Sequence, residues 1–248
     1  RLVGSEMCIR DRNGTMPHGN NNYGKDSAYT HEHGEESSKD SGKTGRCFTG
    51  SGPVTWNHNH HGDGICDLNG NVWEWNAGMR LVDGEIQIIP YNNAAMGSKC
   101  DMSASSTLWK AIKADGSLVE PGTAGTLKWD WVSGKIQLTS GAITYKTDSG
   151  VGGPYKDMTL ASGLTAPEIA KMLLLYPDEP NGDYAGDYHW FNPVGERLPF
   201  CGGFWGNGAN AGVFNLNLNN PRSNANWNIG FRSALPSSQM LQLSLIHI

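Results

Sequence analysis

Nine asparagines lie between Asn207 and Asn228, within the stretch Gly202–Arg232. A carboxamide side chain donates and accepts hydrogen bonds but is neither a nucleophile nor a general base, so these residues offer recognition chemistry. Asn is also disfavoured in β-strands. Its repeated use therefore needs a reason other than local propensity.

The asparagines alternate with apolar residues from Val213 to Asn219, which predicts a β-strand with two different faces. The core face would carry Phe214, Leu216 and Leu218, and the displayed face Asn215, Asn217 and Asn219. A prion-like low-complexity tract or an Asn ladder in a β-solenoid is the alternative. The run has no fixed period and is interrupted by Gly212 and Pro221, which favours a displayed surface.

Other side chains capable of chemistry are sparse. Two groups of polar residues have the donor types of a transition-metal site, although solvated loop histidines are the more common case: His31 and His33, and His58, His60, His61 and Asp63. The chain has no Ser/His/Asp order, phosphate-binding loop or dinucleotide fingerprint, and its Gly202–Gly203 and Gly206–Gly208 segments are predicted turns. The sequence also leaves open whether Cys47, Cys66, Cys100 and Cys201 are buried thiols or form a disulfide.

Several local patterns predict the elements that would hold such a surface. Leu127–Trp131 and Lys135–Leu138 flank Ser133–Gly134, a pattern typical of a hairpin. Ser105 or Ser106 is a candidate cap for a helix that would reach Gly116. Thr165–Glu168 resembles a capping box, and the helix that follows should end before Pro177.

Composition limits the classes of partner. The formal charge is −5, with 19 basic and 24 acidic residues and no basic run, so we predict no nucleic-acid partner. No apolar stretch is long enough to span a bilayer. The abundance of Gly and the nine Trp indicate a loop-rich globular domain with large buried aromatic rings.

Two distant motifs carry a family resemblance. GICDLNGNVWEW (64–75) and the later GGFW and NIGFR (202–205 and 228–232) resemble the formylglycine-generating-enzyme-like, or sulfatase-modifying-factor, branch of the C-type lectin fold. They resemble most closely the variable proteins of diversity-generating retroelements, found in gut phages and bacteria. Segments 81–95 and 107–130 are also similar, so the resemblance covers roughly 53–235. It implies an α+β domain of short, twisted antiparallel strands, few helices and many loops.

The resemblance also implies a reason for the asparagines. Mutagenesis in that family acts at template adenines, and an AAC or AAT codon changed at its first two positions encodes most side-chain classes without a stop codon. The implied function is ligand binding by a diversified segment, 202–232, toward an unknown protein or glycan on a cell surface. The implied variable positions are Phe204, Gly206, Asn207, Asn210, Asn215, Asn217, Asn219, Asn220, Asn224, Asn226, Trp227 and Asn228. For Trp227, a binding anchor and a buried residue are equally compatible with the sequence.

The same resemblance raises an enzyme as the alternative. Formylglycine-generating enzymes oxidise a substrate cysteine at a copper site built from two cysteines. The matching positions here are Asn207 and Gly212, and neither side chain supplies the thiolate that copper(I) requires. We therefore predict that the chain is not an enzyme and has no catalytic residue.

The remaining residues of the motifs are assigned to the scaffold: Trp73, Glu74, Trp75, Gly230, Phe231 and Arg232. The resemblance also makes Asn69 and Glu74 weak calcium candidates. A carboxylate paired with Arg232 or with backbone donors is the preferred role for Glu74, so no cofactor is predicted.

The domain organisation follows from these boundaries. Residues 1–12 and the end of 236–248 resemble translated sequencing-adapter sequence found in metagenome assemblies, and we exclude them from fold reasoning. We expect the natural N-terminus, with any signal peptide or lipid anchor, to be missing. Residues 13–53 form an irregular polar segment, and 54–235 form the domain. A phage tail or a bacterial surface is the implied location.

Overall fold

The computed structural model describes residues 17–21, 32, 39–40, 43–179 and 186–232. The predictions for 1–12 and 236–248, and those for His31 and His33, lie outside these residues. The strands are β1 (Lys39–Asp40), β2 (Lys43–Thr44), β3 (Trp73–Trp75), β4 (Met79–Val82), β5 (Glu85–Ile88), β6 (Lys110–Ile112), β7 (Leu118–Val119), β8 (Lys128–Val132), β9 (Lys135–Thr139), β10 (Val151–Pro154), β11 (Thr159–Leu160), β12 (Tyr188–Phe191), β13 (Glu196–Gly202), β14 (Gly212–Asn220) and β15 (Ile229–Gly230). The helices are α2 (Glu168–Met172) and the 3-10 helices η1 (Val54–Trp56), η2 (Asn93–Lys99), η3 (Tyr155–Asp157) and η5 (Gly208–Asn210).

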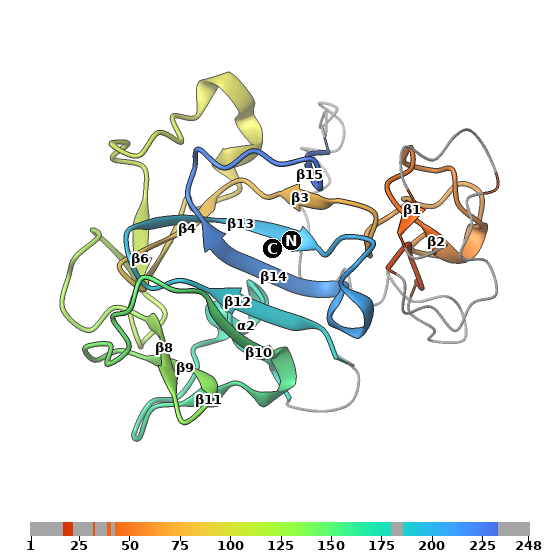
Figure 1. The fold of residues 1–248 in the computed structure, drawn as a ribbon. Coiled ribbons are helices and arrows are strands. Elements are labelled where there is room, and N and C mark those ends of the chain that lie inside the picture. The colour runs from red at the N-terminus through yellow and green to blue at the C-terminus, as the bar shows by residue number, and fades with distance from the viewer. Residues whose placement is uncertain (1–16, 22–31, 33–38, 41–42, 180–185, 233–248) are drawn as a thin grey trace.

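Most of these strands belong to one sheet, which makes the fold sheet-rich with little helix. Its main path runs β10-β12-β14-β13-β4-β5-β8-β9-β11, and β3 extends it by pairing with β13 and β15. Figure 1 shows β3, β13, β14, β12 and β10 side by side, while α2 lies behind them. Most pairs are antiparallel as predicted, but β12 with β14, β9 with β11 and β3 with β15 are parallel.

The predicted hairpin is confirmed. β8 and β9 pair in register from Lys128–Thr139 to Val132–Lys135. Between them Ser133 and Gly134 have φ of 51° and 76°. Two successive positive φ values give the turn whose twist matches that of the strands it joins.

The helix predicted from Ser105 or Ser106 to Gly116 is wrong. Residues 110–112 instead form β6, which pairs with β5 and β7. Ser106 accepts a hydrogen bond from the Leu108 amide within a local turn, at 3.2 Å. Pairing with strands elsewhere in the chain buries Ala111 and Ile112 completely, and this outweighs local helix propensity.

The second predicted helix forms in part. α2 covers 168–172, and no side chain caps its N-terminus, so the predicted capping box is absent. The helix ends before Pro177, as expected. Leu174, with φ of 56°, turns the chain away two residues after the last helical residue.

The core lies between this sheet and the elements behind it. Trp129 of β8 is fully buried, and its ring lies 5.7 Å from His189 and 5.9 Å from Phe191, both on β12. Its indole nitrogen donates to the Leu175 carbonyl, just after α2, at 3.1 Å. The Trp129 side chain thus connects β8 with β12 and with the residue Leu175 that follows α2.

Candidate ligand-binding surface

β14 carries the predicted alternation over most of its length. Phe214, Leu216 and Leu218 are buried in the core. Asn217 and Asn219, on the other face, are half-buried and reach solvent. The strand pairs with β12 on one side and β13 on the other, so its backbone is held at both edges.

The prediction for Asn215 is wrong. This side chain is on the displayed face but is completely buried. Its amide nitrogen donates to the Asn210 carbonyl at 2.5 Å. Because η5 ends at Asn210, the loop before β14 folds back over the first part of the strand and covers this position.

The other predicted variable positions all reach solvent, fully or in part. Exposed are Gly206, Asn210, Asn226 and Trp227; half-buried are Phe204, Asn207, Asn217, Asn219, Asn220, Asn224 and Asn228. Several of the amides also shape their own loop. The side-chain oxygen of Asn207 accepts from the Phe204 amide, and that of Asn226 from the Trp227 amide, each at 2.8 Å.

Aromatic rings lie beside these asparagines in a continuous series, which we call the aromatic row: Trp190, Trp73, Phe204, Trp205 and Trp227. Successive ring centroids are separated by 5.7, 6.4, 5.2 and 4.9 Å. Sheet register places Trp190 directly opposite Asn217, so the row and the displayed face of β14 form one surface. Figure 1 faces this side of the sheet.

The last two rings of the row differ in exposure. Trp205 is buried, whereas Trp227 is 59% exposed, which excludes the buried alternative for Trp227. The Trp227 carbonyl accepts a hydrogen bond from Arg46 at 2.7 Å, so the exposed indole is held on a fixed backbone. Trp190 was not predicted as a site residue because it precedes the Asn-rich segment and only sheet pairing brings it there.

The motif 64–75 positions the start of the variable segment. The Gly70 amide donates to the Gly202 carbonyl at 2.9 Å, and the Trp205 amide donates to the Asn71 carbonyl at 3.2 Å. Gly70 has φ of 80°, and a Cβ there would lie 2.0 Å from the Asn20 carbonyl oxygen, so only glycine fits. The tight turn is therefore a support for segment 202–232.

Described parts of the polar segment 13–53 pack against the same turn. Asn20, Asn21 and Cys47 are buried, and the Asn71 side chain bonds to both the amide and the carbonyl of Cys47, at 3.1 and 3.0 Å. These residues lie at the right-hand end of the molecule in Figure 1. Sequence reasoning missed this contribution because buried Asn–backbone contacts leave no periodic signal.

Arg232 binds the scaffold at the far end of the segment. Its guanidinium makes two hydrogen bonds to the Glu74 carboxylate, at 2.8 and 3.2 Å, and one to the Cys66 carbonyl at 2.8 Å. The preferred role for Glu74 is thus confirmed. Phe231 was also assigned to the scaffold, but its side chain is 79% exposed and is therefore not buried in the core.

The calcium candidates do not present the ligands that calcium needs. The Asn69 amide nitrogen donates to the carbonyls of Pro17 and His18, both at 3.0 Å, and its oxygen accepts from Asn21. Arg232 neutralises Glu74. Calcium sites require several free oxygen ligands, so the residues of this turn do not fit that ion.

The histidine cluster is likewise occupied by structural contacts. The Nδ1 atom of His58 accepts from the Ile65 amide at 2.7 Å, and the His60 ring packs edge-on against His18. In the described ranges, no three His, Cys, Asp or Glu side chains are grouped closely enough to hold a metal ion.

Asn207 and Gly212, which the resemblance aligns with copper-binding cysteines, lie on either side of η5. Asn207 shapes the loop before η5. At Gly212 a Cβ would lie 1.8 Å from a carboxylate oxygen of Asp187, so a side chain there would require that carboxylate to move. Cys201 is on β13, and Cys47, Cys66, Cys100 and Cys201 form no disulfide with one another.

Asp67 is the buried acidic group of this region. Its carboxylate accepts from the Gly50 amide at 2.9 Å. Burial raises the pKa of Asp67 to about 6, against the smaller lowering effects of that hydrogen bond and of Arg232. A carboxyl with this pKa is charged at neutral pH at a cost to the folded state.

We expect Asp67→Asn to abolish one pH-dependent part of the stability. Because the pKa in the folded state lies above the ordinary aspartate value of 3.8, the protonated carboxyl stabilises the fold below about pH 4, and this contribution is lost as pH rises through about 6. The free energy of unfolding of the variant should therefore equal that of the parent near pH 4 and exceed it by roughly 2 kcal/mol at neutral pH. Urea unfolding across this range measures the difference; a difference that does not change with pH would contradict the assignment.

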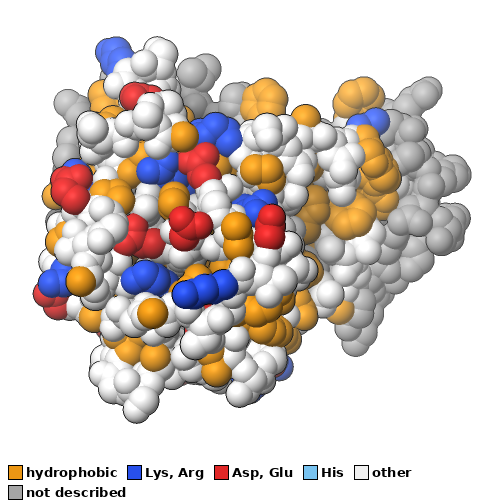
Figure 2. Space-filling model, turned by 60° about the vertical axis from the view of Figure 1, so that its left-hand side comes forward, with side chains coloured by type: hydrophobic (Ala, Val, Ile, Leu, Met, Phe, Trp, Pro, Cys, Tyr) orange, Lys and Arg blue, Asp and Glu red, His pale blue; other side chains and the backbone are white. Residues whose placement is uncertain are grey.

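The surface charge is mixed. On the face in Figure 2, Lys and Arg side chains alternate with Asp and Glu, and hydrophobic side chains gather toward the right. Among the described residues, no helix is long and apolar enough to cross a membrane.

Comparison with known proteins adds no identification. No protein-family model matches the chain, and no curated protein is significantly similar to it.

Proposed function

We propose that this chain is a ligand-binding protein of the C-type-lectin-like fold whose segment 202–232 is diversified by a retroelement. The fold assignment rests on the motif resemblance and agrees with a sheet-rich domain of short strands. The function is recognition, and the partner would be a protein or a glycan on a cell surface. A phage tail or a bacterial surface would present the protein.

One observation carries this proposal. Of the predicted variable positions, all except Asn215 reach solvent, while the interleaved Phe214, Leu216 and Leu218 are in the core. Side chains at the exposed positions therefore vary without disturbing the packing of β14. This is the arrangement that a diversified binding surface requires.

Two members of the aromatic row, Trp190 and Trp73, supply the fixed part of such a surface. Binding energy concentrates in a few aromatic or charged anchors, with polar neighbours providing complementarity. Trp190 and Trp73 precede the diversified segment, so they remain whatever the segment becomes. A copy with asparagine at most variable positions adds hydrogen-bonding groups but little apolar area, and should bind weakly.

Sequencing the locus tests the proposal. We expect a near-copy of the codons for Phe204–Arg232 beside a reverse-transcriptase gene, with differences confined to template adenines. Codons for the half-buried Asn217 and the exposed Asn226 should differ among copies. The codons for the buried Leu216 and Leu218 are the matched control and should not change.

The codon for the buried Asn215 gives a second test in the same experiment. If its codon is diversified, copies that retain a folded protein should carry mainly small polar residues there, because overpacking costs about 1–3 kcal/mol. Differences scattered over all four bases, or equally frequent at the codons for Leu216 and Leu218, would refute diversification.

A further inference from the structure

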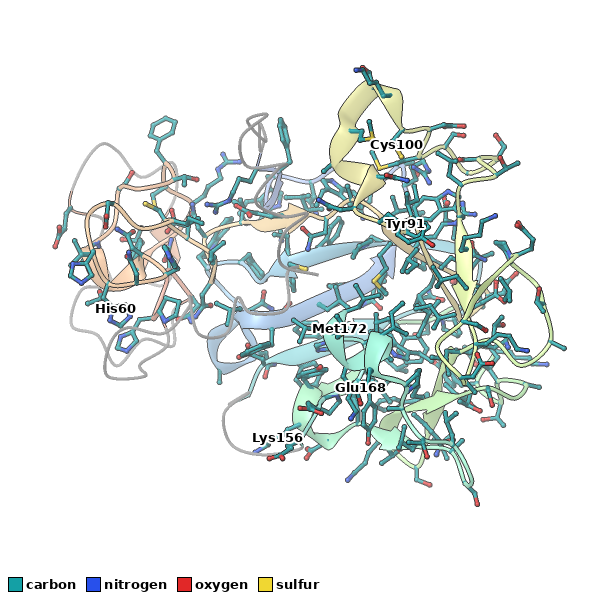
Figure 3. The ribbon with its side chains drawn as sticks, turned by 180° about the vertical axis from the view of Figure 1, so that it is seen from behind. His60, Tyr91, Cys100, Lys156, Glu168 and Met172 are labelled. Atoms are coloured by element: carbon teal, nitrogen blue, oxygen red, sulfur yellow. The ribbon has the colours of Figure 1, made fainter. Side chains whose placement is uncertain are left out.

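A cavity of about 400 Å³ lies on the face of the sheet opposite the asparagines. Cys201 of β13 and Leu216 of β14 form part of its wall, and residues 169–175 close one side. The segment 88–94 closes the other side. Figure 3 shows this side of the molecule, with Tyr91 and Met172 on it.

The chemistry of the lining is apolar and uncharged. Among the described residues, no Lys, Arg, His, Asp or Glu lines the cavity. Two residues of the lining, Asn76 and Cys201, hydrogen-bond to each other: the Asn76 amide nitrogen donates to the Cys201 sulfur at 2.6 Å. Small-molecule sites have volumes of roughly 300–1,000 Å³ and are predominantly apolar with few polar groups. The cavity has both properties.

The backbone around the opening is strained on both sides. Tyr91, Asn92 and Leu174 have φ of 59°, 55° and 56°, a region that residues with a Cβ seldom adopt. Such conformations cluster at ligand-binding sites. Two large side chains are exposed at the rim, since Tyr91 is 87% and Met172 is 50% exposed.

We propose that this cavity binds a small, neutral, apolar molecule. The uncharged lining excludes a ligand whose charged group must be buried, because an unpaired buried charge is strongly unfavourable. The rim residues Tyr91 and Met172 contact the part of the ligand that remains near the opening. None of the proposed variable positions lines the cavity, so this inference does not depend on the proposed function.

Fluorescence titration with N-phenylnaphthylamine and its sulfonated analogue tests the proposal. The neutral probe has about 17 non-hydrogen atoms and should bind saturably, one per chain, with a dissociation constant of about 0.2 mM or lower. The sulfonated probe has the same rings and a negative charge, and should bind at least roughly tenfold more weakly. Equal or tighter binding of the sulfonated probe would overturn the neutral assignment.

Two neighbouring alanines give a matched pair of variants. Ala94 lines the cavity, whereas the exposed Ala95 does not. Ala94→Trp should weaken binding of the neutral probe roughly tenfold or more, and Ala95→Trp should leave it unchanged. Met172→Ala removes a rim contact of the ligand, so it should weaken binding of the neutral probe roughly threefold or more, and it replaces Ala94→Trp as the test if that variant fails to fold. Absence of binding to the parent, or equal binding by the two tryptophan variants, would overturn the proposal.

Discussion

Trp129→Ala is expected to lower the free energy of unfolding by about 4 kcal/mol, the largest effect of any single substitution considered for this chain. The side chain is fully buried, so its removal leaves a large cavity between β8 and β12. It also leaves the Leu175 carbonyl without its indole donor. Urea or thermal unfolding measures the loss.

Two further variants test how much of this loss comes from the indole hydrogen bond and how much from the burial of the ring. Trp129→Phe keeps much of the ring but not the N–H group, and should cost about 1–2 kcal/mol. Trp131→Ala, two residues along the same strand, removes a half-buried ring and should cost clearly less than Trp129→Ala. Equal losses for Trp129→Ala and Trp131→Ala would contradict the central role of Trp129.

Arg232→Ala is expected to lower the free energy of unfolding by about 3 kcal/mol. The substitution leaves the half-buried Glu74 carboxylate without its bidentate partner and removes the donor to the Cys66 carbonyl. β15 should separate from β3, so amide exchange at Ile229 and Gly230 should become faster. Chemical unfolding with hydrogen exchange measures both effects.

Arg222 is the matched control for this prediction. It also makes two hydrogen bonds to one carboxylate, that of Glu196, at 2.8 and 3.0 Å, but its side chain is more exposed. Glu196 keeps Arg80 as a second partner at 2.8 Å. Arg222→Ala should therefore cost about 1 kcal/mol or less. The prediction fails if the two arginine variants are equally stable.

Local sequence patterns predicted the features that depend on neighbouring residues. Ser133 and Gly134 set the turn between β8 and β9 through their own backbone conformations. The apolar alternation of β14 set which side chains enter the core. Both signals lie within a few residues of the element that they determine, so no long-range contact had to be known.

The wrong predictions involve contacts that no local pattern encodes. Asn215 follows the alternation, but a loop that ends at Asn210 covers it. Residues 110–112 have a helical pattern, but pairing with β5 makes them a strand. Trp190 becomes a neighbour of Asn217 only because β12 pairs with β14 in parallel. Each case depends on residues distant in the sequence or on how a loop closes.

Because β14 lies inside the sheet, its backbone pairing determines which substitutions the fold tolerates. Its ladder hydrogen bonds to β12 and β13 are made by the backbone, which every substitution except proline supplies equally. A codon such as AAC reaches proline when both of its first two bases become cytosine. Under the proposed diversification, proline at Asn217 would therefore be the costly product of an otherwise tolerant mutagenesis. Because both long edges of the strand are already paired, new side chains there would not create a free edge for aggregation.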